Sequence, residues 1–208
     1  MYGEGDDMQS NKLRLVPSGT LGLALKAEVL SKADVDRAVT RIAHEILERN
    51  RGANDLVLLG LLRGGEWFSK ALAKRIEALE GLEVPSGVLD VSNFRDDTKF
   101  DRDLVIDLSQ DRSVIPVSPE GKTVILVDDV IFTGRTVRAA LDSLLSRARA
   151  SKVQLAVMVD RGHREVPIRP DFVGKNLPTA MSEYVEVTSD GIRIFQESES
   201  AAPASEDR

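Results

Sequence analysis

The chain has 208 residues, a length that fits one domain with tails. Hydrophobic residues make up 42% and charged residues 30%, so the chain can bury a sizeable core and is too apolar to be wholly disordered. It has no cysteine and only two histidines, which excludes disulfides, thiolate nucleophiles and histidine-rich metal sites. There is no signal-peptide pattern, and no apolar run approaches the roughly 18 residues of a membrane helix, so we expect a cytoplasmic protein with no membrane partner.

The net charge of −6 is carried by the two ends of the chain, which leaves residues 11–196 without net charge. A local basic surface, and therefore a nucleic-acid partner, is compatible with the overall acidity. Both ends are polar and aperiodic. We expect a disordered N-terminal extension over residues 1–25, one domain over 26–196 and a disordered acidic tail over 197–208.

The first half of the domain alternates helical and extended patterns. A Ser-x-x-Asp start followed by apolar residues at helical spacing predicts a helix over residues 31–52. The apolar run at 55–62 predicts a buried strand, which meets the glycine turn Arg63-Gly64-Gly65 and then a second helix over 68–79. A further strand is expected within residues 83–94.

The second half continues the alternation after an irregular segment. Residues 95–119 are polar and only partly periodic, and we expect them to form a mobile excursion that contains a hairpin. Apolar strands are predicted at 123–129 and 152–160, with a helix over 136–147 between them. Such strands alternating with helices are typical of a parallel sheet covered on both faces. The fold class is therefore α/β, with ligands expected at the carboxyl ends of the strands.

One motif lies at such a strand end, in the sequence VILVDDVIFTGRT. Two adjacent carboxylates, Asp128 and Asp129, precede the turn Thr133-Gly134-Arg135-Thr136, which opens a helix. Backbone N–H groups at a helix start can wrap a phosphate, and carboxylates can hold a ribose diol directly or through Mg²⁺ and its waters. Each piece alone can simply end a strand or cap a helix. Together, in this order, they indicate a ribose 5-phosphate site.

This stretch closely resembles the phosphoribosyl-diphosphate signature of the type I phosphoribosyltransferases. Neither a Walker A loop nor a GxGxxG motif occurs, which sets kinases and dehydrogenases aside. The resemblance implies the type I phosphoribosyltransferase fold, with a mainly parallel twisted sheet flanked by helices, a small hood and a flexible loop. It implies that a nucleobase displaces pyrophosphate with the help of Mg²⁺. It also implies that Asp128 and Asp129 are catalytic and hold the metal, directly or through water.

Two further blocks narrow the choice within that family. The basic segment 159–179, together with residues 40–50 and 94–97, resembles the pyrimidine-operon attenuation regulators that are also uracil phosphoribosyltransferases. By composition alone, these blocks are a solvated loop and a polar helix surface. The resemblance implies that phosphoribosyl diphosphate, uracil and UMP or UTP bind one site, that a leader mRNA stem-loop binds another, and that the chain forms a homodimer or homohexamer.

The same resemblance assigns residues to both sites. The RNA-binding positions are Thr40, Arg41, His44, Arg49, Arg164, Arg169 and Lys175. Besides the two aspartates and the turn Thr133–Thr136, the positions for phosphoribosyl diphosphate and UMP are Gly64, Gly65, Arg95, Asp96, Asp97, Val159, Asp160 and Arg161.

The loop after the first predicted strand departs from the family pattern. Arg63-Gly64-Gly65 stands where Thr-Arg-Gly is usual, and Leu62 and Met181 stand where basic residues are common. We expect Arg63 to be catalytic by reaching pyrophosphate, beside an anion nest of glycine N–H groups. Three functions remain open. They are an RNA-binding regulator that makes UMP, an RNA-binding regulator with weak or lost catalysis, and a purine-salvage phosphoribosyltransferase, whose loop the Leu-Arg-Gly-Gly sequence also resembles. We favour the first.

Overall fold

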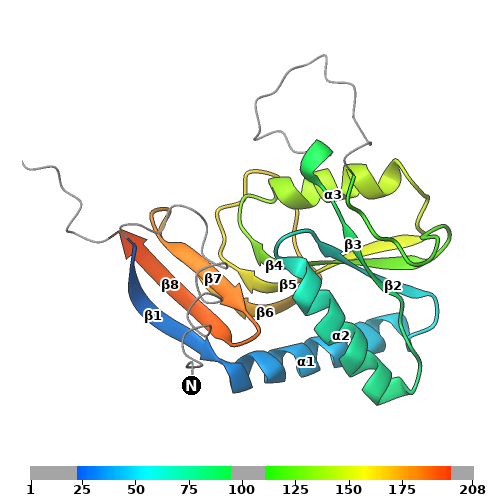
Figure 1. The fold of residues 1–208 in the computed structure, drawn as a ribbon, viewed down its shortest axis with the longest axis horizontal. Coiled ribbons are helices and arrows are strands. Elements are labelled where there is room, and N and C mark those ends of the chain that lie inside the picture. Colours follow the sequence, from blue (N-terminus) through cyan, green and yellow to red (C-terminus); the bar gives the residue numbers. More distant parts are fainter. Residues whose placement is uncertain (1–22, 95–110, 198–208) are drawn as a thin grey trace, which may run out of the picture.

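The computed structural model describes residues 23–94 and 111–197, which form two sheets of different kinds (Figure 1). The larger sheet has the strand order β3-β2-β4-β5-β6, and every neighbouring pair is parallel. Its strands are β2 (Leu56–Leu61), β3 (Ser86–Leu89), β4 (Thr123–Ile131), β5 (Lys152–Asp160) and β6 (Phe172–Asn176). The predicted parallel α/β sheet is confirmed, with β6 as a strand that the sequence analysis did not identify.

Helices cover both faces of this sheet (Figure 1). On one face lie α1 (Lys32–Asn50) and α2 (Gly65–Glu80), and on the other lies α3 (Arg135–Leu145), near the short 3₁₀ helix η1 (Ser92–Phe94). The helix start predicted for α1 forms a capping box, in which Ser31 and Asp34 satisfy each other's backbone N–H groups. All three predicted helices are confirmed.

A second, antiparallel sheet with the strand order β1-β8-β7 lies beside the larger one, and we call it the hood (Figure 1). It consists of β1 (Leu23–Ser31), β7 (Tyr184–Thr188) and β8 (Gly191–Glu197). These strands were not predicted. Leu23 pairs with Glu197, so β1 includes the last residues of the 1–25 segment that was expected to be disordered.

The chain enters and leaves residues 95–110 at neighbouring points of the sheet. Val88 and Val114 form a bridge, and the Asp90 carboxylate accepts a hydrogen bond from Arg112 Nε at 2.9 Å. The hairpin expected in this region falls mainly on residues outside those described, as do the two tails. None of the helices in the described ranges combines the length and apolar content needed to cross a membrane.

Candidate active site and nucleic-acid interface

The two predicted aspartates lie at the carboxyl end of β4, where the parallel strands present their ends together. Asp128 is buried and Asp129 is half-buried. Asp128 Oδ1 accepts a hydrogen bond from the Asp129 N–H at 3.0 Å, and Asp129 Oδ1 accepts one from the Val130 N–H at 2.7 Å. Burial raises the pKa of the Asp129 carboxyl, because water that would solvate its charge is excluded.

The glycine turn after β2 packs directly against these carboxylates. A Cβ atom on Gly64 would lie 2.4 Å from Asp129 Oδ1, and one on Gly65 would lie 1.8 Å from the Val127 carbonyl oxygen. Only glycine allows the two strand ends to approach this closely. The preceding Arg63 is exposed and has a φ of 85°, a left-handed conformation that costs arginine about 1 kcal/mol or more. The turn therefore holds Arg63 in a strained backbone geometry beside the aspartates.

Two helices begin at the carboxyl ends of the parallel strands without side-chain caps. The N-cap of α2 is Gly64 and that of α3 is Gly134, which has a φ of 89°. Neither residue supplies a side chain to bond the N–H groups of the first helical turn. Both helix starts, with their partial positive charge, are therefore suited to bind anionic groups next to Asp128 and Asp129.

The loop after β5 wraps the turn between β4 and α3. Arg164 donates to the carbonyl oxygens of Phe132 at 2.8 Å and of Ile168 at 2.9 Å, and it forms an ion pair with Asp160 at 2.7 Å. The Thr133 carbonyl oxygen accepts the Glu165 N–H at 3.0 Å. Two predicted ligand-binding residues, Arg164 for RNA and Asp160 for nucleotide, thus hold the signature turn in place.

Arg161 connects the same turn to the hood. Its buried guanidinium lies 4.2 Å from the centre of the Phe132 ring and donates to Thr179 Oγ1 at 2.9 Å and to the Glu183 carbonyl oxygen at 2.9 Å. Burial lowers the pKa of Arg161, and the negative charge of Glu183 partly offsets this shift by raising the pKa. Val159, another predicted nucleotide-binding residue, has its side chain fully buried in the core. The side chains of Arg161 and Val159 are therefore engaged within the protein.

A cavity of about 330 Å³ lies between the carboxyl ends of the parallel strands and the hood. Arg63, Gly64 and Asp129 line one side of it, and Tyr184 and Glu186 of β7 line the other. Burial and the nearby charges of Asp129 and Glu186 raise the pKa of the Tyr184 hydroxyl. The sequence analysis did not identify any of the residues that the hood contributes.

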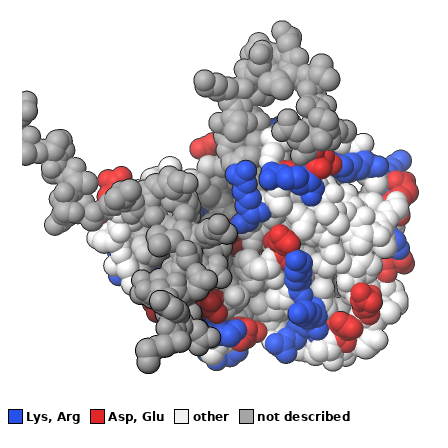
Figure 2. Space-filling view, viewed as in Figure 1, with Lys and Arg blue, Asp and Glu red and all other residues white. Residues whose placement is uncertain are grey.

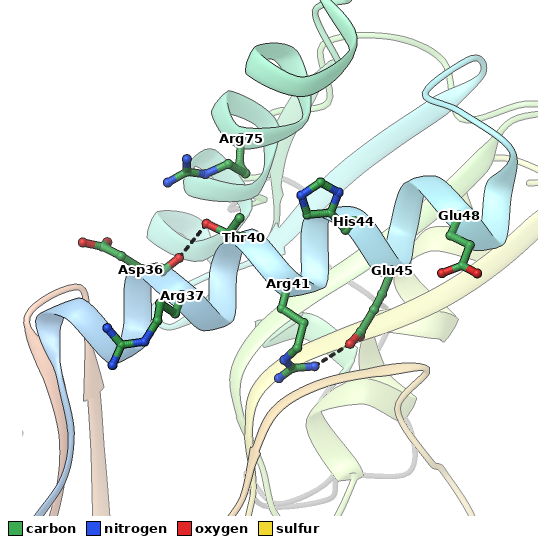
Figure 3. Close-up of a pocket in the computed structure, with 8 residues that line it drawn as sticks. All are labelled: Asp36, Arg37, Thr40, Arg41, His44, Glu45, Glu48 and Arg75. Atoms are coloured by element: carbon green, nitrogen blue, oxygen red, sulfur yellow. Dashed lines mark hydrogen bonds and ion pairs between the residues drawn. The ribbon is translucent and has the colours of Figure 1, made fainter.

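The predicted residues on α1 share its polar face, where a groove of about 590 Å³ runs beside the helix (Figure 3). Thr40, Arg41 and His44 line this groove, and Arg49 lies further along the same helix. The groove also contains acidic residues: Asp36, Glu45 and Glu48. The polar placement of the α1 residues is as predicted, but the groove carries both signs of charge.

The two predicted arginines of α1 already have protein partners. Arg41 forms an ion pair with Glu45 at 2.5 Å and donates to the carbonyl oxygen of Gly174 in β6 at 2.8 Å. Arg49 forms an ion pair with Asp171 at 2.8 Å. The face drawn in Figure 2 likewise shows basic and acidic side chains interspersed over α2 and α3.

Two other predicted positions, Arg169 and Lys175, are exposed, and Lys175 lies on β6, which contacts α1. Arg95, Asp96 and Asp97 fall outside the described residues. Within the described ranges, no cluster of three or more metal-binding side chains occurs. The Asp128–Asp129 pair nevertheless fits Mg²⁺, which commonly binds through one or two carboxylates together with waters and substrate phosphates.

Comparisons with known proteins agree with this architecture. The model of the phosphoribosyl transferase domain matches residues 27–189. "Bifunctional protein PyrR" of Brevibacillus brevis is 52% identical over 78% of this chain and 89% of its own length, and that of Deinococcus radiodurans is 52% identical over 83% and 94%. The crystal structure of a hypoxanthine phosphoribosyltransferase from Trypanosoma cruzi superposes with a TM-score of 0.63 at 18% identity, covering 83% of this chain and 98% of that one.

Proposed function

This chain belongs to the phosphoribosyltransferase family, within the group of bifunctional PyrR proteins, and we propose that it is an RNA-binding regulator that also makes UMP. In the reaction, a ring nitrogen of uracil displaces pyrophosphate from phosphoribosyl diphosphate. In its regulatory role, the protein binds a leader mRNA stem-loop more tightly when a uridine nucleotide occupies the site, so that transcription of a pyrimidine operon terminates. We place this activity in the cytoplasm.

The observation that carries the catalytic proposal is the position of Asp128 and Asp129 between two uncapped helix starts. The N–H groups at the start of α3 bind the 5-phosphate, and those near Gly64 bind pyrophosphate with Arg63. The two carboxylates hold the ribose hydroxyls. As the bond to pyrophosphate breaks, positive charge develops on the ribose ring, and the fixed negative charge of the aspartates stabilises it.

Asp128 and Asp129 would hold Mg²⁺ directly or through water, and the metal would supply positive charge to balance that of the departing pyrophosphate. The hood forms one wall of the cavity beside Asp129, so substrates bound there would be shielded from water. Exclusion of water protects the cationic ribose from hydrolysis before uracil attacks. The chain itself therefore supplies binding, orientation and electrostatic stabilisation more than proton transfer.

The RNA-binding proposal rests on the relationship to the PyrR proteins and on the basic residues of two neighbouring elements. Thr40, Arg41 and His44 line the groove beside α1, and Arg41 contacts β6, which carries Lys175. Arginine and lysine can contact phosphates, and an arginine plane can stack on an unpaired base of an RNA loop. A homodimer or homohexamer would present several copies of this face to one RNA.

The test measures pyrophosphate release from phosphoribosyl diphosphate and Mg²⁺, with uracil, hypoxanthine and guanine as acceptors in parallel. Turnover with uracil alone is expected. Turnover with a purine would overturn the assignment in favour of purine salvage. Turnover with no base, in a folded protein that binds UMP, would leave only the regulatory activity.

The regulatory activity is tested by titrating a pyrimidine-operon leader hairpin with and without UMP at two salt concentrations. We expect UMP to tighten binding and salt to weaken it steeply. Binding that ignores UMP or salt would contradict the proposal.

A further inference from the structure

The groove beside α1 continues onto α2. A second cavity of about 490 Å³ lies between the two helices and is lined by Trp67, Lys70 and Lys74 of α2, among others. Asp36 of α1 and Arg75 of α2 line both cavities, so the two hollows adjoin. The candidate RNA-binding face is therefore a longer groove that runs along α1 and across to α2.

The basic residues in this groove differ in how far they are already engaged. On α1, Arg37 forms an ion pair with Asp34 and Arg41 forms one with Glu45. On α2, Lys70 forms an ion pair with Glu66 at 2.7 Å. An arginine or lysine that already has a carboxylate partner must give up that contact before it can bind a phosphate, which reduces the net gain.

Two basic residues of the groove remain uncommitted. Lys74 is exposed and Arg75 is half-buried, and neither forms a hydrogen bond or ion pair with any residue in the described part of the chain. Figure 3 shows Arg75 projecting from α2 on the side where Thr40 and His44 of α1 are presented. The uncommitted positive charge of the groove is thus concentrated on α2, next to the α1 face.

We propose that Lys74 and Arg75 bind the sugar–phosphate backbone of the leader RNA as it crosses from α1 to α2, an inference that rests on the proposed RNA-binding function. The positive charges of the two residues complement the negative phosphates, and neither residue loses an ion pair with a described residue when a phosphate approaches it. Contacts of this kind position the RNA without reading its sequence. Continuity with the α1 groove favours RNA over an acidic protein segment as the occupant.

The test compares two double variants of equal charge in a titration of the labelled leader hairpin. Lys74→Gln/Arg75→Gln removes the two cations of the groove. Arg149→Gln/Lys152→Gln removes two exposed cations at the amino-terminal end of β5, neither of which forms an ion pair with a described residue. Equal melting temperatures check that all the proteins are folded, and sedimentation reports their oligomeric state.

The groove variant is expected to bind the hairpin about tenfold more weakly at 0.1 M salt, and the slope of log affinity against log salt is expected to become shallower by about 2. The control variant is expected to keep both values near those of the unmodified protein. Equal effects of the two variants, or none, would overturn the proposal. A changed oligomeric state in the groove variant alone would also overturn it, because Lys74 and Arg75 would then belong to a subunit contact.

If the unmodified protein turns over uracil but does not bind the hairpin, the proposed RNA-binding function itself fails. That result is visible before either variant is made. Failure of the further inference alone instead requires an unmodified protein that binds the hairpin normally.

Discussion

The site at the carboxyl ends of the parallel strands and the groove beside α1 are built in opposite ways. At the strand ends, backbone groups, the buried Asp128 carboxylate and the half-buried Asp129 carboxylate are held in place, and Gly64 leaves no room for an additional atom. In the groove, long exposed side chains form ion pairs with one another. A preorganised site loses most of its activity when one atom is misplaced. A groove of exposed charges loses affinity in small, roughly additive steps.

Among the substitutions that test this difference, Asp129→Asn is expected to have the largest effect. In the proposed reaction the charge of Asp129 stabilises the cationic ribose, so its removal should reduce uracil turnover by about 100-fold or more. Binding of the leader hairpin in the absence of nucleotide should be unaffected, because Asp129 does not line the α1 groove. Asp142→Asn on the exposed side of α3 is the matched control for turnover. Equal turnover in the two variants would remove Asp129 from the active site.

Gly64→Ala is expected to have the next largest effect. The added methyl group would lie 2.4 Å from Asp129 Oδ1, so the turn or the carboxylate must shift. We expect turnover to fall by about 10- to 100-fold, with a higher KM for phosphoribosyl diphosphate and unchanged hairpin binding in the absence of nucleotide. Steady-state kinetics with phosphoribosyl diphosphate as the varied substrate measure both values. Normal kinetics would mean that the loop moves away from Asp129 when substrate binds.

Arg164→Ala tests both regions at once. Arg164 was predicted to bind RNA, but in the structure it holds the turn between β4 and α3. Its loss leaves the Phe132 carbonyl and the Asp160 carboxylate without their partner, which should cost about 2 kcal/mol of unfolding free energy. Turnover should fall together with hairpin binding. Arg169→Ala, at an exposed position of the same loop, should weaken hairpin binding only. Urea unfolding, turnover and hairpin titration of both variants separate these outcomes.

The smallest effect concerns the pH dependence of stability. Asp90 is buried, which opposes ionisation, but hydrogen bonds from Ser92 and Arg112 lower the pKa of its carboxyl to about 2. Because the pKa is lowered on folding, the stabilisation is complete above the unfolded value near 3.8 and is lost as the pH falls through about 2.

The contribution should be about 2 kcal/mol at pH 7. Urea unfolding of the unmodified protein and of Asp90→Asn should differ by this amount at neutral pH. The difference should shrink when the pH is lowered towards 2. A difference that does not vary with pH would mean that the Asp90 contacts do not depend on its charge.

The parallel sheet was predictable because its strands are continuous apolar runs punctuated by glycine turns. The hood was not identified, although its last two strands carry a recognisable signal. Val185, Val187, Ile192 and Ile194 alternate with polar residues around an Asp-Gly turn, a pattern typical of a hairpin. β1 gives no such signal, because it is largely exposed and its pairing with β8 contains two register shifts.

The residues of the phosphoribosyl-diphosphate signature were predictable because the signature is defined by the order of residue types along the chain. The surroundings of the basic residues were not. An arginine in a polar segment is normally exposed, yet Arg161 is buried on the Phe132 ring and Arg164 bonds the carbonyl oxygens of a turn. These roles depend on contacts that only folding creates.

The pairing of β1 with β8 joins the first and last strands of the described chain. During synthesis, β1 leaves the ribosome long before its partner, whereas β2 and β4 can already begin the larger sheet. Pairings between segments far apart in sequence form slowly. Tyr184 and Glu186, which form one wall of the cavity, are also synthesised late, so a nascent chain carries the two glycine turns before the cavity has that wall.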